Sequence, residues 1–395
     1  MPVRGGKGGT MEAEKILNIG LLGYGHMGRT HAYCLSVLPF YAPSVAQHAR
    51  LYGLCTAHPD SARTAAAGLG GVRVYDRPED MIRDPDIDIV DICTPNVFHY
   101  DALRAAVQSG KHIYCEKPLC FDLKEADTVA GETSFPVYGR TCGIVFHNRF
   151  FPAVRLAKRY LEEGRLGSIL QFRFDYLHNS CIFPDKPAGW KQDATVCGGG
   201  VLFDLGSHML DLLTYLLGPL DSLFAKEQIA FPVRTGRDGQ TWTVNADEAS
   251  YLLITLKNKA VGTLTVSKIS SGTEDDLSFA IYGENGALRW SLTDMDYLEF
   301  AEETSPNSYH GFTRIAVNGR YAGTDPDFPS VKAPAGWLRA HVGCYTAFLN
   351  AVLGGRAACP SFAQGAYVQY LMDRAQESAR AGREVSLERE APEWI

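Results

Sequence analysis

The chain has 395 residues, of which 46% are apolar and 21% are charged, and its formal net charge is -7. This length predicts two domains, and the composition is that of a globular protein with a full core. The thin spread of Lys and Arg argues against nucleic acid or an anionic membrane as the main partner. No apolar run is expected to reach the length of a membrane span.

The N-terminal residues and the cysteines indicate a compartment. Met1 to Thr10 is basic and Gly-rich and lacks the hydrophobic segment of a signal peptide, so residues 1–14 are expected to form a flexible tail. The ten cysteines form no Cys-x-x-Cys pair, and no zinc site is predicted. Most fall in apolar segments, where cysteine behaves as a small hydrophobe. A reducing compartment, the cytoplasm, is the simplest account.

The first expected strand, residues 15–22, leads into a dinucleotide-binding pattern. It ends in Gly23-Tyr24-Gly25-His26-Met27-Gly28, which has the Gly-x-Gly-x-x-Gly spacing. Gly23 permits a tight turn, Gly25 lets the backbone approach a pyrophosphate, and Gly28 lets the following helix pack on the strand. A glycine-rich turn of another α/β fold is the alternative.

The next segments concern the choice of cofactor. The first helix is expected to end near Leu38, before a proline-broken connection at residues 39–43. The second strand, residues 51–56, ends in Thr56, where a dinucleotide site usually carries an acid for the adenosine ribose. No acid is present, and no Arg directly follows to bind a 2′-phosphate. NAD is therefore favoured, with NADP left open.

Strands and helices alternate as far as residue 143, which predicts a parallel sheet with right-handed crossovers. Further strands are expected at residues 72–75, 87–93, 113–115 and 134–143, and helices at 60–67, 78–82 and 99–109. Ligands bind beyond the carboxyl ends of such strands. Thr94-Pro95-Asn96 and Glu116-Lys117 follow two of them. Lys117 is therefore expected to face the cofactor crevice.

Residues 144–395 are predicted to form a second domain that begins at a hinge, residues 147–150. A helix at 151–163 and a strand at 168–176 precede a loop at 177–197, whose length is typical of a binding loop or a lid. Strands at 220–229, 250–256, 260–269 and 277–282 predict an antiparallel sheet with helices on one face. Residues 304–334 are expected to be irregular, and helices at 337–353 and 363–380 close the chain.

A glycine-rich entry opens an apolar helix at residues 198–219. Asp204 and His208 are four residues apart and share one helix face. Unpaired polar groups in a buried helix are costly. The two residues are therefore either a satisfied pair that locks the helix to the core or part of a functional site.

Four motifs in this order resemble the glucose-fructose oxidoreductase / inositol dehydrogenase / MocA (Gfo/Idh/MocA) family. They are the motif from Gly23 to Gly28, Thr94-Pro95-Asn96, Glu116-Lys117-Pro118-Leu119, and the stretch from Gly198 to Asp211. The resemblance spans nearly the whole chain. The connection at residues 39–43 and the loop with Trp190 are most similar to the levoglucosan dehydrogenase and glucoside 3-dehydrogenase members.

The resemblance implies a fold, an assembly and an activity. The expected fold is an α/β chain with an NAD(P)-binding Rossmann domain at residues 15–143. The C-terminal substrate-binding and oligomerisation domain is expected to have an open, mainly antiparallel sheet, through which the chain forms a homodimer or homotetramer. The expected activity is that of an NAD(P)-dependent dehydrogenase, which oxidises a secondary hydroxyl of a sugar, glycoside or polyol to a ketone.

The same resemblance implies three catalytic positions, and the chemistry of the residues suggests their roles and the ligand contacts. Lys117, Asp204 and His208 are the expected catalytic residues: His208 as base, Lys117 as the group that stabilises a developing alkoxide, and Asp204 as the residue that orients them or the substrate. The cofactor is expected to contact the motif from Gly23 to Gly28 together with Thr56, Thr94, Pro95, Asn96, His99, Glu116 and Lys117. The substrate is expected to contact Lys117, Arg149, Tyr176, His178, Trp190, Asp204 and His208.

Other interpretations stay open. An inositol dehydrogenase would use the same three catalytic residues. A reductase of the biliverdin, imine or dihydrodipicolinate type, or a glycosidase that uses NAD, is disfavoured by the Asp204 and His208 pair. A non-catalytic dinucleotide-binding sensor could do without Lys117 or His208. A metal-dependent hydrolase that uses Asp204, His208 and His178 lacks a ligand spacing of known type, and no metal is predicted.

Overall fold

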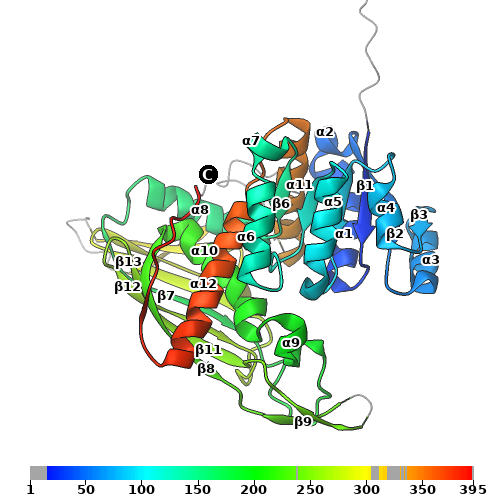
Figure 1. Cartoon of the computed structure of the whole chain (residues 1–395). Helices are drawn as coiled ribbons and strands as arrows, with labels where there is room; N and C mark the ends of the chain where they lie inside the picture. Colours follow the sequence, from blue (N-terminus) through cyan, green and yellow to red (C-terminus); the bar gives the residue numbers. More distant parts are fainter. Residues whose placement is uncertain are drawn as a thin grey trace, which may run out of the picture.

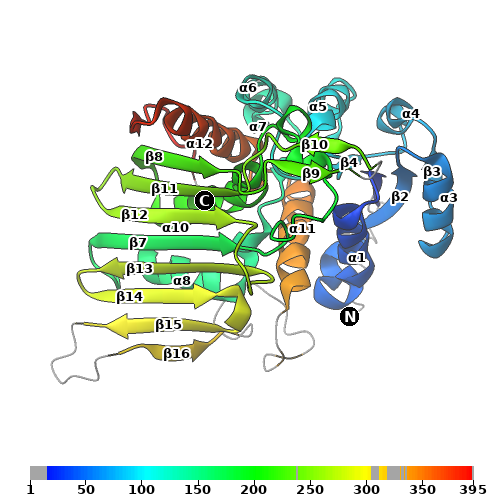
Figure 2. The same cartoon turned by 90° about the horizontal axis from the view of Figure 1, so that it is seen from below.

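The computed structural model describes residues 16–236, 239–303, 311–317, 330, 333 and 336–393. The predicted tail at residues 1–14 and most of the predicted irregular segment at 304–334 lie outside them. A six-stranded sheet forms the N-terminal half and a nine-stranded sheet the C-terminal half (Figures 1 and 2). The predicted α/β fold class is confirmed.

The N-terminal sheet is parallel throughout and has the strand order β3-β2-β1-β4-β5-β6. Its central strands are buried on both faces, as expected of parallel strands covered by helices. Its strands are β1 (Leu17–Leu22), β2 (Ala49–Cys55), β3 (Arg73–Tyr75), β4 (Ile89–Ile92), β5 (His112–Cys115) and β6 (Cys142–Ile144).

Helices cover both faces of this sheet. Helix α1 packs with α11 on one face, and α4, α5 and α6 form a row on the other (Figure 2). The helices of this half are α1 (His26–Tyr41), α2 (Pro43–Ala46), α3 (Pro59–Gly68), α4 (Pro78–Arg83), the short 3-10 turn η1 (Asn96–Phe98), α5 (His99–Gln108), α6 (Leu123–Glu132) and α7 (Phe135–Tyr138).

The C-terminal sheet is mixed, with the order β16-β15-β14-β13-β7-β12-β11-β8-β17. Only β7 and β12 pair in parallel among its paired strands, and the other pairs are antiparallel. Its strands are β7 (Ile169–Leu177), β8 (Leu220–Gln228), β11 (Ala249–Leu256), β12 (Val261–Ser267), β13 (Asp276–Gly283), β14 (Gly286–Ser291), β15 (Tyr297–Glu302), β16 (Thr313–Ala316) and β17 (Val385–Ser386), and a separate hairpin is formed by β9 (Val233–Thr235) and β10 (Thr241–Thr243).

Helices α8, α10 and α12 lie on one face of this sheet and leave the other face open (Figures 1 and 2). Helix α12 also packs on α6 and so joins the two halves. The helical segments are η2 (His147–Phe150), α8 (Pro152–Glu162), η3 (Trp190–Gln192), α9 (Ala194–Cys197), a π-helical turn (Leu202–Gly206), α10 (Ser207–Leu217), η5 (Leu292–Asp294), α11 (Trp337–Leu353) and α12 (Phe362–Ala381).

Helix α11 returns from the C-terminal half to the nucleotide-binding half. It packs along α1, its Phe348 stacks on Tyr114 of β5 at 4.6 Å, and the Tyr114 hydroxyl donates to Cys344 Sγ at 3.2 Å. The predicted boundary between residues 143 and 144 therefore divides the chain by sequence, but α11, which follows this boundary, packs with the first sheet.

Several local predictions were wrong. Residues 134–143 form the short helix α7 before β6, because Pro136 fits the first turn of a helix. Helix α1 continues through Pro39 to Tyr41, since a proline in the last turn removes few helical hydrogen bonds. Segment β16 falls inside the stretch expected to be irregular. The predicted glycine-rich entry and helix at 198–219 are present, with a π-helical turn at residues 202–206 inside the helix.

The helical stretch 194–217 is long and apolar enough by composition to cross a membrane, which corrects the expectation that no such run exists. Most of its apolar window, 83%, is buried inside the protein. It is the central helix of the second half, packed between the sheet and the other helices.

A buried ion pair fixes η2 to α10. Arg149 Nε donates to Asp211 Oδ2 at 2.9 Å, and a second guanidinium nitrogen donates to the other carboxylate oxygen. Arg149 Nη1 also donates to Gln364 Oε1 at the start of α12, at 3.1 Å. The two charged side chains are 3% and 1% exposed, so this bidentate pair joins three segments in the interior.

Asp211→Leu or Arg149→Met alone is expected to lower the free energy of unfolding by about 3–5 kcal/mol, because each leaves a buried charge uncompensated. The double variant is expected to lose less than the sum of the two losses, since it removes both charges. Urea unfolding followed by circular dichroism measures both effects. Single-variant losses under about 1 kcal/mol, the value of an exposed pair, would contradict the prediction.

Candidate active site

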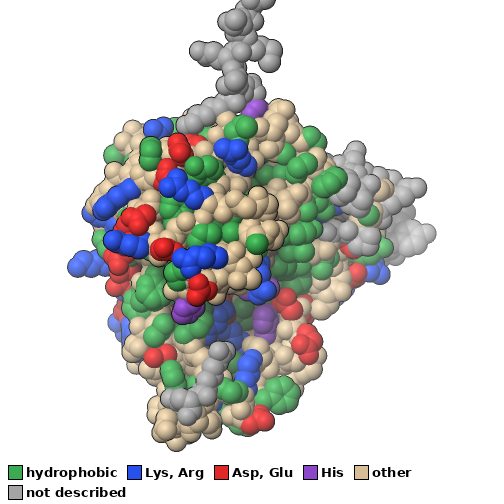
Figure 3. Space-filling view, turned by 90° about the vertical axis from the view of Figure 1, so that its right-hand side faces the viewer, with side chains coloured by type: hydrophobic (Ala, Val, Ile, Leu, Met, Phe, Trp, Pro, Cys, Tyr) green, Lys and Arg blue, Asp and Glu red, His purple; other side chains and the backbone are tan. Residues whose placement is uncertain are grey.

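A cleft of about 500 Å³ lies between the two halves. The space-filling view of this side of the molecule shows histidine and basic side chains in a hollow (Figure 3). Both halves contribute to its walls, which are lined by Gly25, His26, Met27, Cys93, Thr94, Pro95, Asn96, Glu116, Lys117, Pro118, His147, Tyr176, His178, Trp190, Lys191, Cys197, Gly199, Gly200, Phe203, Asp204, Leu205, His208 and Trp337.

The glycine-rich turn between β1 and α1 has the geometry of a phosphate cradle. Gly23 has a φ of +94°, and a Cβ there would lie 2.7 Å from the Cys93 carbonyl oxygen. A Cβ on Gly28 would lie 2.1 Å from the Gly23 carbonyl oxygen, so only glycine lets α1 pack this closely on β1. Gly25 faces open space at the N-terminus of α1, where backbone N–H groups can bind a phosphate.

The turn after β4 offers polar atoms to a cofactor. Thr94 Oγ1 and Asn96 Oδ1 are buried at the cleft and have no hydrogen-bond partner within the described part of the chain. The Asn96 side-chain amide donates to the Cys197 carbonyl at 2.9 Å, which ties this turn to α9 of the second half. Buried polar atoms are normally paired, so these two oxygens fit a ligand with hydroxyl or amide groups. The residues present therefore fit a dinucleotide.

Asp204 is surrounded by three lysines from three segments. Lys117 Nζ lies 3.1 Å from Oδ1 and donates to the Asp204 carbonyl at 2.7 Å. Lys191 Nζ and Lys268 Nζ each lie 2.8 Å from Oδ2. Burial raises the pKa of this carboxyl, but Lys268, Lys117 and Lys191 lower it more, so the pKa lies well below its usual value and Asp204 is charged.

The π-helical turn and its cap explain how Asp204 reaches this position. Gly200 N and Leu202 N donate to the two carboxylate oxygens of Asp247, at 2.7 and 2.9 Å. These hydrogen bonds satisfy backbone amides at the helix start that have no partner within the helix. A Cβ on Gly200 would lie 1.9 Å from the Asp247 carbonyl oxygen, so the approach requires glycine. Turns of this kind recur at functional sites, and here the turn contains Asp204.

His208 lies one turn further along and is 7% exposed. Burial lowers the pKa of His208, the Lys117 ammonium lowers it further, and the Asp204 carboxylate only partly opposes them, so the pKa lies well below its usual value. The ring is therefore neutral at physiological pH and is able to accept a proton.

The outer part of the cleft carries groups suited to a hydroxylated ligand. Tyr176 and His178 extend from the end of β7, and His178 Nε2 lies 2.9 Å from Asp275 Oδ1. Trp190 lines the mouth with its indole 43% exposed, and Lys191 Nζ lies 5.6 Å from the ring centroid. An exposed indole beside polar groups is a common setting for stacking on a sugar ring.

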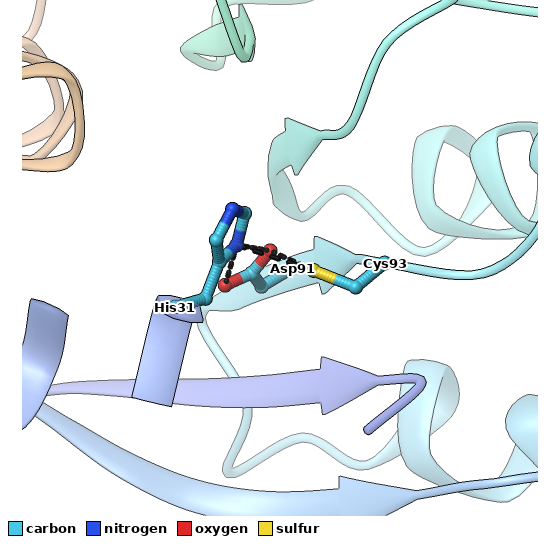
Figure 4. A group of neighbouring side chains, drawn as sticks. All are labelled: His31, Asp91 and Cys93. Carbon is cyan, nitrogen blue, oxygen red and sulfur yellow. Dashed lines mark hydrogen bonds and ion pairs between the residues drawn. The ribbon is translucent and has the colours of Figure 1, made fainter. Parts of the chain in front are cut away.

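A buried hydrogen-bonded cluster lies behind the cofactor side of the cleft. His31 Nδ1 lies 2.8 Å from Asp91 Oδ1 and 3.2 Å from Cys93 Sγ (Figure 4), and its Nε2 lies 3.2 Å from Glu116 Oε1. The Tyr345 hydroxyl of α11 donates to Asp91 Oδ2 at 2.8 Å. Burial lowers the pKa of His31, but Asp91 and then Cys93 raise it to well above its usual value.

His31 is therefore a buried imidazolium between two carboxylates. His31, Asp91 and Cys93 bring their donor atoms close enough to hold a metal ion. Their mutual hydrogen bonds already satisfy one another, so the cluster is complete as an ion-pair network.

Most of the predicted site residues meet at the cleft. Lys117, Asp204, His208, Tyr176, His178 and Trp190 all line it, as do Gly25, His26, Met27, Thr94, Pro95, Asn96 and Glu116. Gly23, Tyr24, Gly28 and Thr56 are not among its lining residues; Gly23 and Gly28 shape the turn from behind.

Two predicted contacts have a different place in the structure. Arg149 is buried against Asp211 and does not line the cleft, because its guanidinium is needed to neutralise that carboxylate. His99 is also buried behind the wall, where its Nδ1 lies 3.0 Å from the Pro118 carbonyl and its Nε2 2.9 Å from the Thr94 carbonyl. His99 therefore holds the two loops that carry Asn96 and Lys117.

Sequence reasoning did not assign Lys191, Lys268, His147 or Trp337 to the site. Lys268 directly follows the buried strand β12, the same signal that singled out Lys117 after β5. The other three had no local signal that separated them from ordinary loop or helix residues.

A Rossmann domain that contributes a lysine to a cleft, closed by a second domain that contributes Asp and His, is the arrangement of a nicotinamide-dependent oxidoreductase. Residues 17–133 match the family model described as the oxidoreductase family, NAD-binding Rossmann fold. Residues 158–387 match the model of the same family's C-terminal alpha/beta domain. The chain belongs to the Gfo/Idh/MocA oxidoreductase family, and its N-terminal half is an NAD-binding domain.

Similar proteins include sugar dehydrogenases. The levoglucosan dehydrogenase of Pseudarthrobacter phenanthrenivorans is 30% identical over 92% of this chain and 96% of its own length. The D-glucoside 3-dehydrogenase of Escherichia coli is 26% identical over 85% of this chain and 90% of its own length. The structure of a levoglucosan dehydrogenase in complex with NADH and levoglucosan superimposes with a TM-score of 0.89 at 29% identity, covering 94% of this chain and 99% of that one.

Proposed function

We propose that this protein oxidises a secondary hydroxyl of a sugar, glycoside or polyol to a ketone, with NAD as the hydride acceptor. The observation that carries the proposal is the convergence of Lys117 from one half with Asp204 and His208 from the other at one cleft. The similarity to levoglucosan dehydrogenase and D-glucoside 3-dehydrogenase supports the substrate class.

Bound NAD would lie along Gly25, His26, Thr94 and Asn96, and its nicotinamide supplies the hydride-accepting carbon. The protein must remove the hydroxyl proton. His208 is the base, because it is neutral and faces the cleft. Lys117 donates a hydrogen bond to the same oxygen and stabilises its negative charge. Asp204 holds the Lys117 ammonium in place through their ion pair.

The outer cleft would position the substrate. Tyr176, His178 and Lys191 offer hydrogen bonds to hydroxyl groups, and Trp190 offers a flat surface for one face of the ring. A polyol such as inositol presents the same secondary hydroxyl, so it is the second candidate substrate; a myo-inositol 2-dehydrogenase of Thermotoga maritima is 25% identical over 69% of this chain.

His208→Ala and Lys117→Ala are each expected to lower the turnover number by about 10²–10⁴-fold, because each removes a group that acts on the reacting oxygen. NADH absorbance with a panel of free sugars, an anhydrosugar, alkyl and aryl glucosides and inositols measures the effect. Near wild-type turnover in both variants would refute the assigned roles. Dinucleotide binding without turnover on any member of the panel would favour the non-catalytic sensor.

We propose further that NAD is preferred to NADP. Burial, followed by the carboxylates of Glu79, Asp76 and Asp80, raises the pKa of the Cys55 thiol at the end of β2 to about 11. The three carboxylates are thus close enough to the end of β2 to act on Cys55, the residue before Thr56, and a 2′-phosphate bound there would meet the same negative charge.

The ratio kcat/KM is expected to be larger for NAD⁺ than for NADP⁺ by about tenfold or more, which corresponds to about 1.4 kcal/mol. Thr56→Arg is expected to raise the use of NADP⁺, and Thr56→Gln, which adds length without charge, is the matched control. Equal values of kcat/KM for NAD⁺ and NADP⁺ in the wild type would show that the nearby carboxylates do not discriminate between the two cofactors.

We also propose that a second copy of the chain covers the open face of the large sheet. Phe224, Leu253 and Val261 are 37–51% exposed on β8, β11 and β12, and Leu253 lies directly opposite Phe224. Their neighbours Leu252 and Ile254 point to the opposite, helix-covered face and are buried. An open apolar sheet face of this kind is typical of an oligomer interface.

Light scattering is expected to give the molar mass of a dimer or tetramer for the wild type. The double variant Leu253→Asp, Val261→Asp is expected to have a smaller molar mass, because it places two charges in the interface. Val137→Asp, on α7 and 77% exposed, is the control and should not change the mass. A monomeric wild type would overturn the proposal.

Since all ten cysteines are free thiols, we propose that the protein works in a reducing compartment such as the cytoplasm.

A further inference from the structure

Three histidines, His208, His147 and His341, form a buried row that begins at the cleft. Their exposed fractions are 7%, 4% and 2%. Both ring nitrogens of His147 and of His341, and Nδ1 of His208, have no hydrogen-bond partner within the described residues. An unpaired buried polar atom costs about 1–3 kcal/mol, so five of them in one place require an explanation.

The three rings are close neighbours from three different segments. The His147 ring, in η2, meets the His208 ring of α10 edge-on, with centroids 5.0 Å apart and an interplanar angle of 81°. The His341 ring of α11 stacks on His147 at 3.6 Å and 19°. Trp337, one turn before His341, packs at 4.3 Å from His341 and at 5.5 Å from His147 and closes the row on the cleft side.

The charged groups around the three histidines disfavour protonation of their rings. Lys117, Asp204 and Lys191 act on His208, and Tyr176 of β7 and Phe146 lie beside its ring at 6.4 Å. Lys117 and the His31 imidazolium act on both His147 and His341, and His26 of α1 acts on His341. Burial, followed by these positive neighbours and by the rings themselves, lowers the pKa of all three well below the usual value.

The row therefore holds neutral rings. In hydrolytic triads the second nitrogen of the base is held by a carboxylate, which stabilises the imidazolium. Among the described residues His208 has no such partner at Nδ1, and the ring beside it is His147. Because Lys117 disfavours an imidazolium at His208 and at the other two rings, a proton that His208 takes up cannot rest there and must move on.

We propose that His147 and His341 accept and pass on the proton that His208 removes from the substrate. The proposal builds on the dehydrogenase activity proposed above. The C–H electron pair leaves with the hydride, and the O–H proton goes to His208, which then gives a proton from Nδ1 to His147. Because the rings are not hydrogen-bonded to each other, rotation of His147 or a bridging water completes the transfer. Each ketone formed leaves one proton on the row, and the row gives this proton up to solvent before the next turnover, which balances the oxidation.

His147→Ala and His341→Ala test the row by chemical rescue, after circular dichroism and NADH fluorescence have shown that each variant folds and binds the cofactor. The first turnover is expected to stay near the wild-type rate, followed by a steady-state rate about 10–100-fold lower, because His208 can discharge its proton only slowly. Added imidazole should restore the steady-state rate of His147→Ala, and the restoration should vary with the pKa of methylated imidazoles. Phe146→Ala is the matched control, because it opens a cavity beside the His208 ring without removing a nitrogen. Added imidazole should not change the rate of this variant.

The two proposals can be told apart by the wild type. If no sugar or polyol reduces NAD⁺ with the unaltered protein, the proposed function is wrong. If the wild type turns over and both histidine variants keep its steady-state rate, the relay is wrong. Equal losses in the first and later turnovers without rescue by imidazole would likewise overturn the relay and leave His147 and His341 as packing residues.

If His147→Ala or His341→Ala does not fold, His147→Phe and His341→Phe replace them. Phenylalanine keeps the stacked rings and removes only the nitrogens, and the expected result is the same burst of NADH before a slower steady state. The acidic limb of the pH profile of kcat gives an independent readout. In His341→Phe this limb should move to higher pH, since His341 lowers the pKa of His208. An unchanged limb together with an unchanged rate would overturn the proposal.

Discussion

At the cleft, one carboxylate links the two halves of this protein. Asp204 contacts the ammonium groups of Lys117, Lys191 and Lys268, which come from the end of β5, the loop before α9 and the end of β12. A carboxylate buried without cations would be protonated, whereas this one stays charged. The position of Lys117 in the cleft therefore depends on a helix of the other half, and the charge of Asp204 depends on both halves.

The nucleotide-binding half depends in the same way on the end of the chain. His31 is buried between Asp91 and Glu116, and Tyr345 of α11 completes the hydrogen bonds of Asp91. Glu116 also accepts a hydrogen bond from the backbone N–H of Lys117 at 3.1 Å. One network thus fixes α11, the base of the nucleotide site and the strand end that carries the lysine.

Local patterns predicted the first half better than the second. The glycine spacing after β1 and the polar ends of β4 and β5 are determined by backbone conformation over a few residues, and these predictions agree with the structure. Arg149 was placed in the substrate pocket because its partner Asp211 lies 62 residues further along the chain, beyond any local pattern. Residues 134–143 were assigned to a strand by their apolar content, although Pro136 favours a helical first turn.

The sequence by itself determined the family and the Rossmann half and singled out Lys117, Asp204 and His208, because these follow from short motifs that set backbone geometry and from their order along the chain. Only the tertiary structure decided which cations surround Asp204, that α11 returns to the first sheet, and that His147 and His341 lie behind His208. Lys117 and Asp204 are 87 residues apart, and His147 and His341 come from different segments. Contacts between segments so far apart depend on how whole elements pack, which residue spacing along the chain does not encode.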